Sequence, residues 1–269
     1  MSGAVPSRFR RRVTAGESLV GAFVNLGSSS TAEIMAIGGF DWLVIDLEHG
    51  AGDEQQVFTQ LQAIEGAGVA ALVRVEAIDQ MRFQRVLDLG AVGVLAPMLR
   101  SAEDARRCVD FCRYARNRGV AKHNRSWQWT LATGSLADAD DQVVCAVQIE
   151  TAEALREVDQ IAAVEGVDVL FVGPGDLAHS LGMDCGPDHP DLRAEIAKVA
   201  VAAKRHGKAA GIFVNSIELA SAYQREGFNF LGCSSDSSLL AHEARRVAEG
   251  LHSLVQGSVT TPLRPTGQP

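Results

Sequence analysis

Long apolar runs and aromatic residues are scarce in this sequence of 269 residues. No run reaches the roughly 18 apolar residues of a membrane-spanning helix, so we expect no membrane partner. Arg8 and the arginines at 10–12 are not followed by the apolar segment that a signal peptide requires. Aromatic residues make up 6% of the chain, so the apolar content is mostly Ala, Val and Leu. We expect a cytoplasmic protein.

The charge balance and the cysteines argue against two further classes. The net charge is −8, whereas a general nucleic-acid binder needs a basic face. We therefore expect no nucleic-acid partner, while a small anionic ligand stays open. None of the five cysteines stands in a Cys-x-x-Cys pair. Cys108 and Cys112 share one face of a predicted helix, but no second pair completes a zinc site, so we expect ordinary reduced thiols.

What the sequence does contain is a regular alternation of short apolar runs and helical patterns. The hydrophobic share of 46% supports a large core. The runs are apolar throughout, as expected for parallel strands covered on both faces. Eight strand–helix units in about 250 residues predict an α/β fold of the (β/α)8 TIM-barrel type, and a doubly wound sheet is the alternative. The predicted strands are Val20–Val24, Trp42–Asp46, Ala70–Val75, Val92–Ala96, Val143–Ile149, Val169–Val172, Ala209–Phe213 and Asn229–Gly232.

No linker divides the chain, so we expect one barrel domain over residues 16–256, with flexible tails at 1–15 and 257–269. The second tail is rich in Pro, Thr and Gly, a composition typical of disorder. The one long interruption is Ala115–Asp141, rich in Arg, Asn, Ser and Trp. Loops of this length are usually functional or disordered.

Ionisable residues follow several of the predicted strands at their carboxyl ends. In a TIM barrel these ends form one face, and that face carries the active site. Folding does not require the pattern, because a packed barrel can end its strands in Gly, Ser and Asn. The residues are Asp46, Glu48 and His49 after the second strand, Arg74 after the third, Gln148 and Glu150 after the fifth, and Asp176 after the sixth.

Four of these residues also have a purely structural explanation. Glu150 can be an acid favoured by the dipole at a helix start, and Asp176 can be an N-cap after a Gly-Pro-Gly turn. Arg74 can be a structural ion-pair partner, and His49 a buried histidine with its hydrogen bonds satisfied. Asp88 differs, because it lies near a helix carboxyl end, where a negative charge is disfavoured by roughly 0.3–1 kcal/mol. This placement favours a partner for Asp88, and His49 is the candidate.

Taken together, these side chains favour enolate chemistry. Glu150 and Asp176 suit a hard divalent cation whose other positions are filled by water and substrate. Arg74 can bind a carboxylate or enolate oxygen through its fork of donors, and with the cation it would stabilise the oxyanion. His49 titrates near neutral pH, so it can move protons. No lysine ends a predicted strand, which argues against a Schiff-base aldolase.

Five motifs resemble, in the same order, those of the metal-dependent class II pyruvate aldolases. That family includes 2-dehydro-3-deoxyglucarate aldolase and 4-hydroxy-2-oxoheptanedioate aldolase, and is also described as the citrate lyase/aldolase family. The resemblance implies a TIM barrel of the phosphoenolpyruvate/pyruvate-binding type, a last helix exchanged between subunits, and a homohexamer built as a trimer of dimers. The motifs are GFDWLVIDLEHG, LVRV, LDLGAVGVLAPM, VQIET and GVDVLFVGPGDLAHSLG.

The same resemblance implies a role for each site residue. His49 would be the catalytic acid/base and Asp88 its orienting partner, and Arg74 would bind pyruvate and stabilise the enolate. Glu150 and Asp176 would hold Mg²⁺, Mn²⁺ or Co²⁺. The remaining implied residues are Gln148, Phe213 and the backbone of Gly175 and Asp176 at the substrate, and Asp46 and Glu48 as supports for His49 and metal-bound water.

One loop departs from the family's pattern. After the fourth strand, family members often read Tyr-Pro-Pro-x-Gly-x-Arg-Gly, whereas this sequence reads RYARNRGVAKHNRSWQW and lacks both prolines. We expect this loop to face the aldehyde end of the site, where it would hold an anionic or aromatic aldehyde; a solvated or interface loop is the alternative. The side chains concerned are Lys122, His123, Arg125, Trp127 and Trp129.

The expected activity is a divalent-metal-dependent, reversible cleavage of a 4-hydroxy-2-oxo acid into an aldehyde and pyruvate, or a close 2-oxo acid. One alternative is a lyase for an acyl-CoA ester, such as citramalyl- or malyl-CoA, in which the altered loop would bind the nucleotide. Another is a barrel that binds a 2-oxo acid without catalysis. Turnover across a panel of aldehydes would distinguish the aldolase from the non-catalytic binding protein.

Overall fold

The computed structural model describes residues 4–257, so most of the expected tail at 257–269 lies outside the described residues. The chain divides into two compact units, Met1–Asp236 and Ser237–Pro269. The domain expected over residues 16–256 therefore extends beyond the first unit into the second. Within residues 4–257, every helix is too short or too polar to cross a bilayer.

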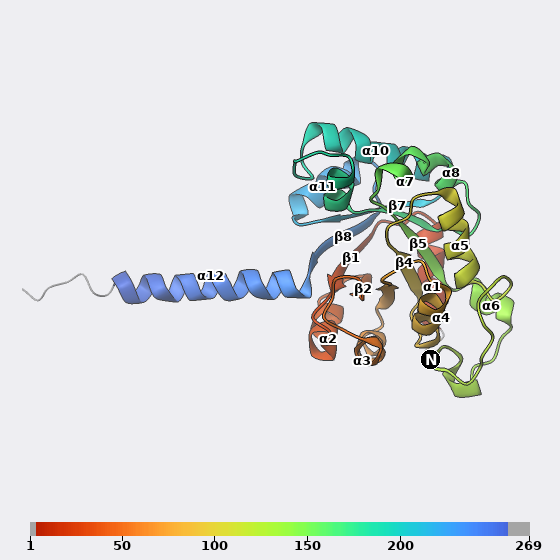
Figure 1. The fold of residues 1–269 in the computed structure, drawn as a ribbon. Helices are drawn as coiled ribbons and strands as arrows, with labels where there is room; N and C mark the ends of the chain where they lie inside the picture. Colours follow the sequence, from red (N-terminus) through yellow and green to blue (C-terminus); the bar gives the residue numbers. More distant parts are fainter. Residues whose placement is uncertain (1–3, 258–269) are drawn as a thin grey trace, which may run out of the picture. The chain divides into compact units, whose positions relative to one another are not determined.

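The first unit is a closed barrel of eight parallel strands in sequential order, with β1 also paired to β8 (Figure 1). The predicted TIM-barrel fold is confirmed. Seven strands lie within two residues of their predicted ends, whereas the last extends three residues further, to Ser235. The strands are β1 (Leu19–Val24), β2 (Trp42–Asp46), β3 (Ala70–Arg74), β4 (Gly93–Ala96), β5 (Val144–Ile149), β6 (Val169–Val172), β7 (Ala209–Val214) and β8 (Phe230–Ser235).

Helices alternate with the strands, and several begin at a Ser, Thr or Asp side chain that accepts a hydrogen bond from the first turn. The helices of the first unit are α1 (Ala4–Thr14), α2 (Ser29–Ile37), α3 (Glu54–Gly66), α4 (Gln80–Asp88), α5 (Ala102–Cys112), the 3-10 helix η1 (Arg125–Thr130), α6 (Leu136–Asp140), α7 (Ala152–Arg156), α8 (Val158–Ala162), α9 (Pro174–Ser180), α10 (Pro190–Arg205) and α11 (Ile217–Arg225).

Large aromatic rings fill the inside of the barrel. Trp42 of β2 is fully buried and stacks on Phe230 of β8, with ring centroids 4.2 Å apart. Gly21 of β1 faces the same indole, and a Cβ there would lie 2.1 Å from the ring of Trp42. A glycine is therefore required at position 21, because only a bare backbone leaves room for the tryptophan.

Helix α1 lies where the sequence predicted a flexible tail. Phe9 and Val13, one helical turn apart, are buried in the same aromatic cluster as Phe230. Arg10 donates to the carboxylate of Asp168 through Nε and Nη2, at 3.2 and 2.9 Å. Asp168 directly precedes β6, so α1 covers the amino ends of the strands and closes that end of the barrel.

The second unit contains one long helix, α12 (Asp236–Gly257), which begins at the last residue of the first unit. Its apolar residues are spaced by three, four or seven positions, the spacing of one helix face. They are exposed, at 60% for Leu240, 58% for Leu251 and 69% for Leu254. This helix therefore carries an apolar stripe along one face.

Candidate active site

Asp46 and Arg74 are paired at the carboxyl ends of β2 and β3. Their Cα atoms are partners in the strand register, which places both side chains at the same height on the barrel. Arg74 Nε donates to Asp46 Oδ1 at 2.9 Å, and Arg74 Nη2 donates to Asp46 Oδ2 at 2.7 Å. This two-point contact fixes the plane of the guanidinium.

Arg74 makes a third contact with Glu48, whose Oε2 lies 2.9 Å from Nη1. Burial disfavours the charge on Arg74, but the hydrogen bonds with Asp46 and the charge of Glu48 outweigh it and raise the pKa of Arg74 above its ordinary value. The two hydrogen bonds with Asp46 leave three of the five guanidinium N–H groups for another acceptor. Arg74 is therefore a permanently charged group with donors still available for a substrate oxygen.

Asp46 also holds the backbone that carries His49. Its Oδ1 accepts hydrogen bonds from the N–H groups of Glu48 and His49, at 3.1 and 3.3 Å. Gly50 follows, and a Cβ there would lie 2.0 Å from the carbonyl oxygen of Asp46, so the turn requires glycine. The His49 side chain is 67% exposed, with Nε2 3.9 Å from Glu48 Oε2. His49 is not the buried histidine of the structural alternative, and its ring is open to solvent.

Glu150 follows β5 and is almost completely buried. Its Oε1 accepts a hydrogen bond from the backbone N–H of Met98 at 2.6 Å, and its Oε2 accepts one from Gln148 Nε2. Burial raises the pKa of Glu150 to about 7, and the nearby carboxylates of Glu48 and Asp176 act in the same direction.

The charges at this end of the barrel fit a hard divalent cation. Glu48, whose pKa is also raised by burial, and Asp176 both act electrostatically on Glu150, so these carboxylates share one site. A cation with oxygen ligands would offset their charge. Among residues 4–257, no three or more His, Cys, Asp and Glu side chains form a metal-binding group. If a cation binds here, Glu150 and Asp176 would hold it, with water and substrate as the remaining ligands.

Three further predicted residues lie around these carboxylates. Gln148 is buried, and its Oε1 has no hydrogen-bond partner. Gly175 and Asp176 are exposed in the first turn of α9. Phe213 of β7 contacts Phe23 with ring centroids 5.0 Å apart. Phe23 itself lies against Arg74, with the guanidinium carbon 5.1 Å from the ring centroid.

Within one chain, Asp88 does not join this site, and it has a different partner from the expected His49. Helix α4 runs antiparallel to the strands, so its last residue, Asp88, lies at the amino end of the barrel. No hydrogen bond or ion pair of the described residues joins Asp88 to His49. Asp88 instead accepts a hydrogen bond from Arg118 at 3.1 Å. Burial raises its pKa, and Arg118 opposes the shift.

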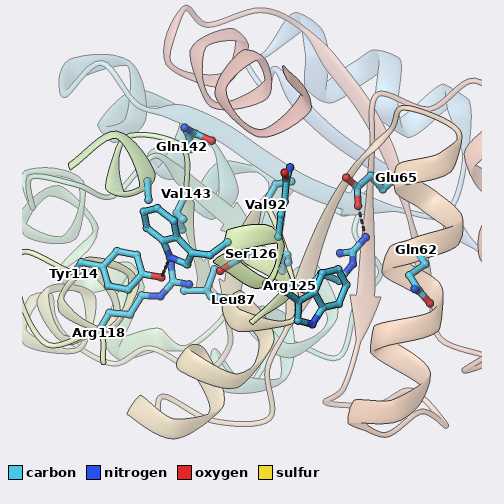
Figure 2. Close-up of a pocket in the computed structure, with 16 residues that line it drawn as sticks. Gln62, Glu65, Leu87, Val92, Tyr114, Arg118, Arg125, Ser126, Gln142 and Val143 are labelled. Atoms are coloured by element: carbon cyan, nitrogen blue, oxygen red, sulfur yellow. Dashed lines mark hydrogen bonds and ion pairs between the residues drawn. The ribbon is translucent and has the colours of Figure 1, made fainter. Parts of the chain in front are cut away.

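The altered loop lies at the same amino end, so within one chain it does not face the strand-end site. It connects α5 to the start of β5. Its residues line a cavity of about 400 Å³ beneath Val92 and Val143, which directly precede β4 and β5. Figure 2 shows Arg125 reaching Glu65 on one side of this cavity, with Tyr114 and Arg118 on the other.

Lys122 and Trp127 of this loop make contacts within the loop and with Tyr114, close to it in the sequence. The ammonium of Lys122 lies 4.4 Å from the ring centroid of Trp127, whose indole N–H donates to Tyr114 Oη at 2.9 Å. His123 and Trp129 are exposed. The loop is therefore a folded surface feature of the barrel's amino end.

Sequence reasoning missed two groups that touch the predicted residues. One is Phe23 of β1. It stands inside an apolar run, and the sequence does not distinguish a phenylalanine beside the site from one in the core. The other is the backbone N–H of Met98, which bonds Glu150. The motif LAPM contains Met98, but a sequence does not show which backbone donor meets which carboxylate.

Comparison with known proteins places the chain among aldolases. Residues 19–243 match the family described as HpcH/HpaI aldolase/citrate lyase. The chain is 39% identical over 243 residues to 4-hydroxy-2-oxo-heptane-1,7-dioate aldolase of Escherichia coli, covering 89% of this chain and 93% of that protein. It is 38% identical over 234 residues to 2-dehydro-3,6-dideoxy-6-sulfogluconate aldolase of Pseudomonas putida, covering 86% and 92%.

The solved structures agree. A HpcH/HpaI aldolase/citrate lyase family protein from Burkholderia cenocepacia superimposes with a TM-score of 0.87 at 36% identity, covering 91% of this chain and 99% of that one. The family match at residues 19–243 spans the strand-end residues described above. The chain accordingly belongs to the HpcH/HpaI aldolase/citrate lyase family and is a carbon–carbon lyase of the aldolase type.

Proposed function

We propose that this aldolase requires a divalent cation and reversibly cleaves a 4-hydroxy-2-oxo acid into an aldehyde and pyruvate, or a close 2-oxo acid. The observation that carries the proposal is the gathering of Arg74, Glu48, Glu150 and Asp176 at one end of the barrel, where burial and mutual repulsion raise the pKa of Glu150 to about 7. Three carboxylates that interact with one another, one of them buried, favour a cation at this site.

Each residue then has a defined task. Glu150 and Asp176 hold the cation, Mg²⁺, Mn²⁺ or Co²⁺, which when bound supplies Lewis-acid stabilisation of the charge that develops on the substrate's keto oxygen. Arg74, fixed by Asp46, donates its remaining N–H groups to the same developing oxyanion. Gln148, Phe213 and the backbone at Gly175 line the 2-oxo acid. His49, exposed at the mouth, moves the proton of the substrate hydroxyl.

Asp88 can orient His49 only from another copy of the chain, because the two residues lie at opposite ends of one barrel. The same holds for Lys122 and the rest of the altered loop. We therefore extend the proposal to an oligomer in which the amino end of one barrel meets the carboxyl end of another. The apolar stripe of α12 supports association of copies, and the expected arrangement is a hexamer with exchanged last helices.

The aldehyde product is proposed to carry an anionic group. The names of the two relatives describe substrates with a second acidic group at the far end, a carboxylate in one and a sulfonate in the other. In this chain, the exposed Lys122 and His123 are cationic or titratable groups that a neighbouring copy would bring to the mouth. The alternative of a CoA-dependent lyase relies on the same loop and has no separate support.

Pyruvate alone tests the proposal, because enolisation exchanges its methyl protons. In D₂O with Mg²⁺, Mn²⁺ or Co²⁺, the protein should replace these protons with deuterium, followed by NMR, and a chelator should stop the exchange. Glu150→Gln should lose the exchange, whereas Glu153→Gln, which changes an exposed carboxylate three residues away, should keep it. Absence of exchange with all three metals would contradict the proposed enolate chemistry.

A further inference from the structure

Met98 has an unusual backbone conformation beside the candidate active site. It follows β4 and has a φ of +57°, in the left-handed region that side chains other than glycine rarely adopt. Its side chain is 46% exposed, so packing in the core does not explain the conformation. Strained residues of this kind tend to occur at functional sites.

Two consecutive hydrogen bonds tie this turn to the end of β5. The N–H of Met98 donates to Glu150 Oε1 at 2.6 Å, and the carbonyl oxygen of Leu99 accepts from Thr151 Oγ1 at 2.6 Å. Residues 98 and 99 thus pair with residues 150 and 151. The left-handed turn at Met98 redirects the chain between these two bonds.

The other sides of the Glu150 carboxylate are also enclosed. Oε2 accepts from Gln148 Nε2, and a Cβ at Gly173 would lie 2.7 Å from Oε2. Gln148 belongs to the same strand as Glu150, and Gly173 contributes only a bare backbone. Met98 is therefore the donor that holds the carboxylate from the segment after the neighbouring strand, β4.

We propose that Met98 is a positioning residue, whose strained backbone holds Glu150 in the orientation that binds the cation. The inference rests on the proposed function, since it assumes that Glu150 is a metal ligand. The active group is the N–H of residue 98 in a left-handed conformation, and the methionine side chain is not required. Any residue that adopts positive φ readily should therefore serve at this position.

Binding of Mn²⁺ alone, followed by isothermal titration calorimetry on the full chain, tests the inference. Met98→Gly and Met98→Asn accept a positive φ and should bind Mn²⁺ within about threefold of wild type. Met98→Val and Met98→Thr are β-branched and oppose it, so binding should weaken by about tenfold or more, as for loss of a hydrogen bond to a charged group. All four variants lose the methionine side chain, so a side-chain effect would change them alike.

A rate measurement separates positioning from general damage. At saturating Mn²⁺, Met98→Val should recover a pyruvate exchange rate close to that of Met98→Gly, because excess metal compensates for a weakened ligand. Thr151→Val, which loses the bond to Leu99, should weaken Mn²⁺ binding severalfold, while Thr151→Ser, which keeps the hydroxyl, should not.

The outcomes distinguish this inference from the proposed function. Equal Mn²⁺ affinity in Met98→Val and Met98→Gly would overturn the positioning role alone, and so would equal loss in both. A wild-type protein that binds no Mn²⁺, or a Glu150→Gln variant that binds it as tightly as wild type, would overturn the proposed function and this inference with it.

Discussion

Asp46 shows how much one buried side chain organises at this site. Its carboxylate accepts from two backbone N–H groups and two guanidinium nitrogens, from Glu48, His49 and Arg74. These donors occupy both oxygens of the buried carboxylate. Asp46 therefore positions the backbone of His49 and the side chain of Arg74. The acids left to interact with a cation are Glu48, Glu150 and Asp176.

Glu150 should make the stability of the metal-free protein fall as the pH rises. In the folded chain its pKa is about 7, above the ordinary value of 4.5. Its contribution to stability is therefore complete below the lower value and is lost as the pH rises through the upper one. From about pH 5 to about pH 8 the loss should be about 2–3 kcal/mol, measured by urea unfolding with EDTA present.

Two comparisons isolate this effect from the other titrating groups. Glu150→Gln should lack this part of the pH dependence, and Glu153→Gln should retain it. Added Mn²⁺ should restore stability at the higher pH, because the cation binds the ionised carboxylate. An unchanged pH slope in Glu150→Gln would show that the carboxyl of Glu150 titrates normally.

The candidate residues at the mouth could be found from the sequence because they end predicted strands. Chain direction alone places Arg74, Glu150 and Asp176 at one end of a parallel barrel. Their contacts could not be predicted in the same way. That Arg74 binds Asp46 and Glu48, or that Met98 bonds Glu150, depends on side-chain conformations and on one left-handed turn, neither of which leaves a periodic signal.

At the scale of elements, α1 shows where periodicity fails. Its sequence, AVPSRFRRRVT, reads as a basic tail because four of eleven residues are arginine. Phe9 and Val13 are two apolar positions one turn apart, too few for an amphipathic pattern. They are nevertheless buried in the barrel interior. The burial of this helix depends on its contacts with the barrel, so it can be recognised only in the three-dimensional structure.

Arg10 should anchor this helix. Asp168 is buried and is bonded by Arg10, by the N–H of Cys145 at 2.9 Å, and weakly by Arg113 at 3.6 Å. Arg10→Ala should lower the free energy of unfolding by roughly 1–3 kcal/mol, since a buried carboxylate loses its best partner. Denaturant unfolding measures the effect, with the exposed Arg8→Ala, expected within about 0.5 kcal/mol of wild type, as the control. An Arg10→Ala protein as stable as Arg8→Ala would contradict an anchoring role.

At the scale of the whole molecule, the strand–helix alternation was sufficient to predict the barrel. It did not predict which residues each loop contacts. In a parallel barrel, a segment that runs from a helix to the next strand lies at the amino ends of the strands. Asp88 and the Lys122–Trp129 loop are both in such segments. The family resemblance implies that they act at the active site, whereas the topology places them at the opposite end of the barrel. The proposed assembly of copies would satisfy both.

Subunit complementation tests that arrangement. His49→Ala and Asp88→Asn should each abolish aldol cleavage when expressed alone. Co-expressed in one cell, they should form mixed oligomers in which some sites combine His49 of one copy with Asp88 of another. Random mixing at equal amounts predicts recovery of roughly a quarter of wild-type activity.

His49→Ala with Arg74→Ala is the matched control and should recover none, because these two residues lie at the same mouth of one chain. Failure of the first pair to recover activity, with oligomers shown to be mixed by mass spectrometry, would mean that Asp88 does not act on His49 across copies.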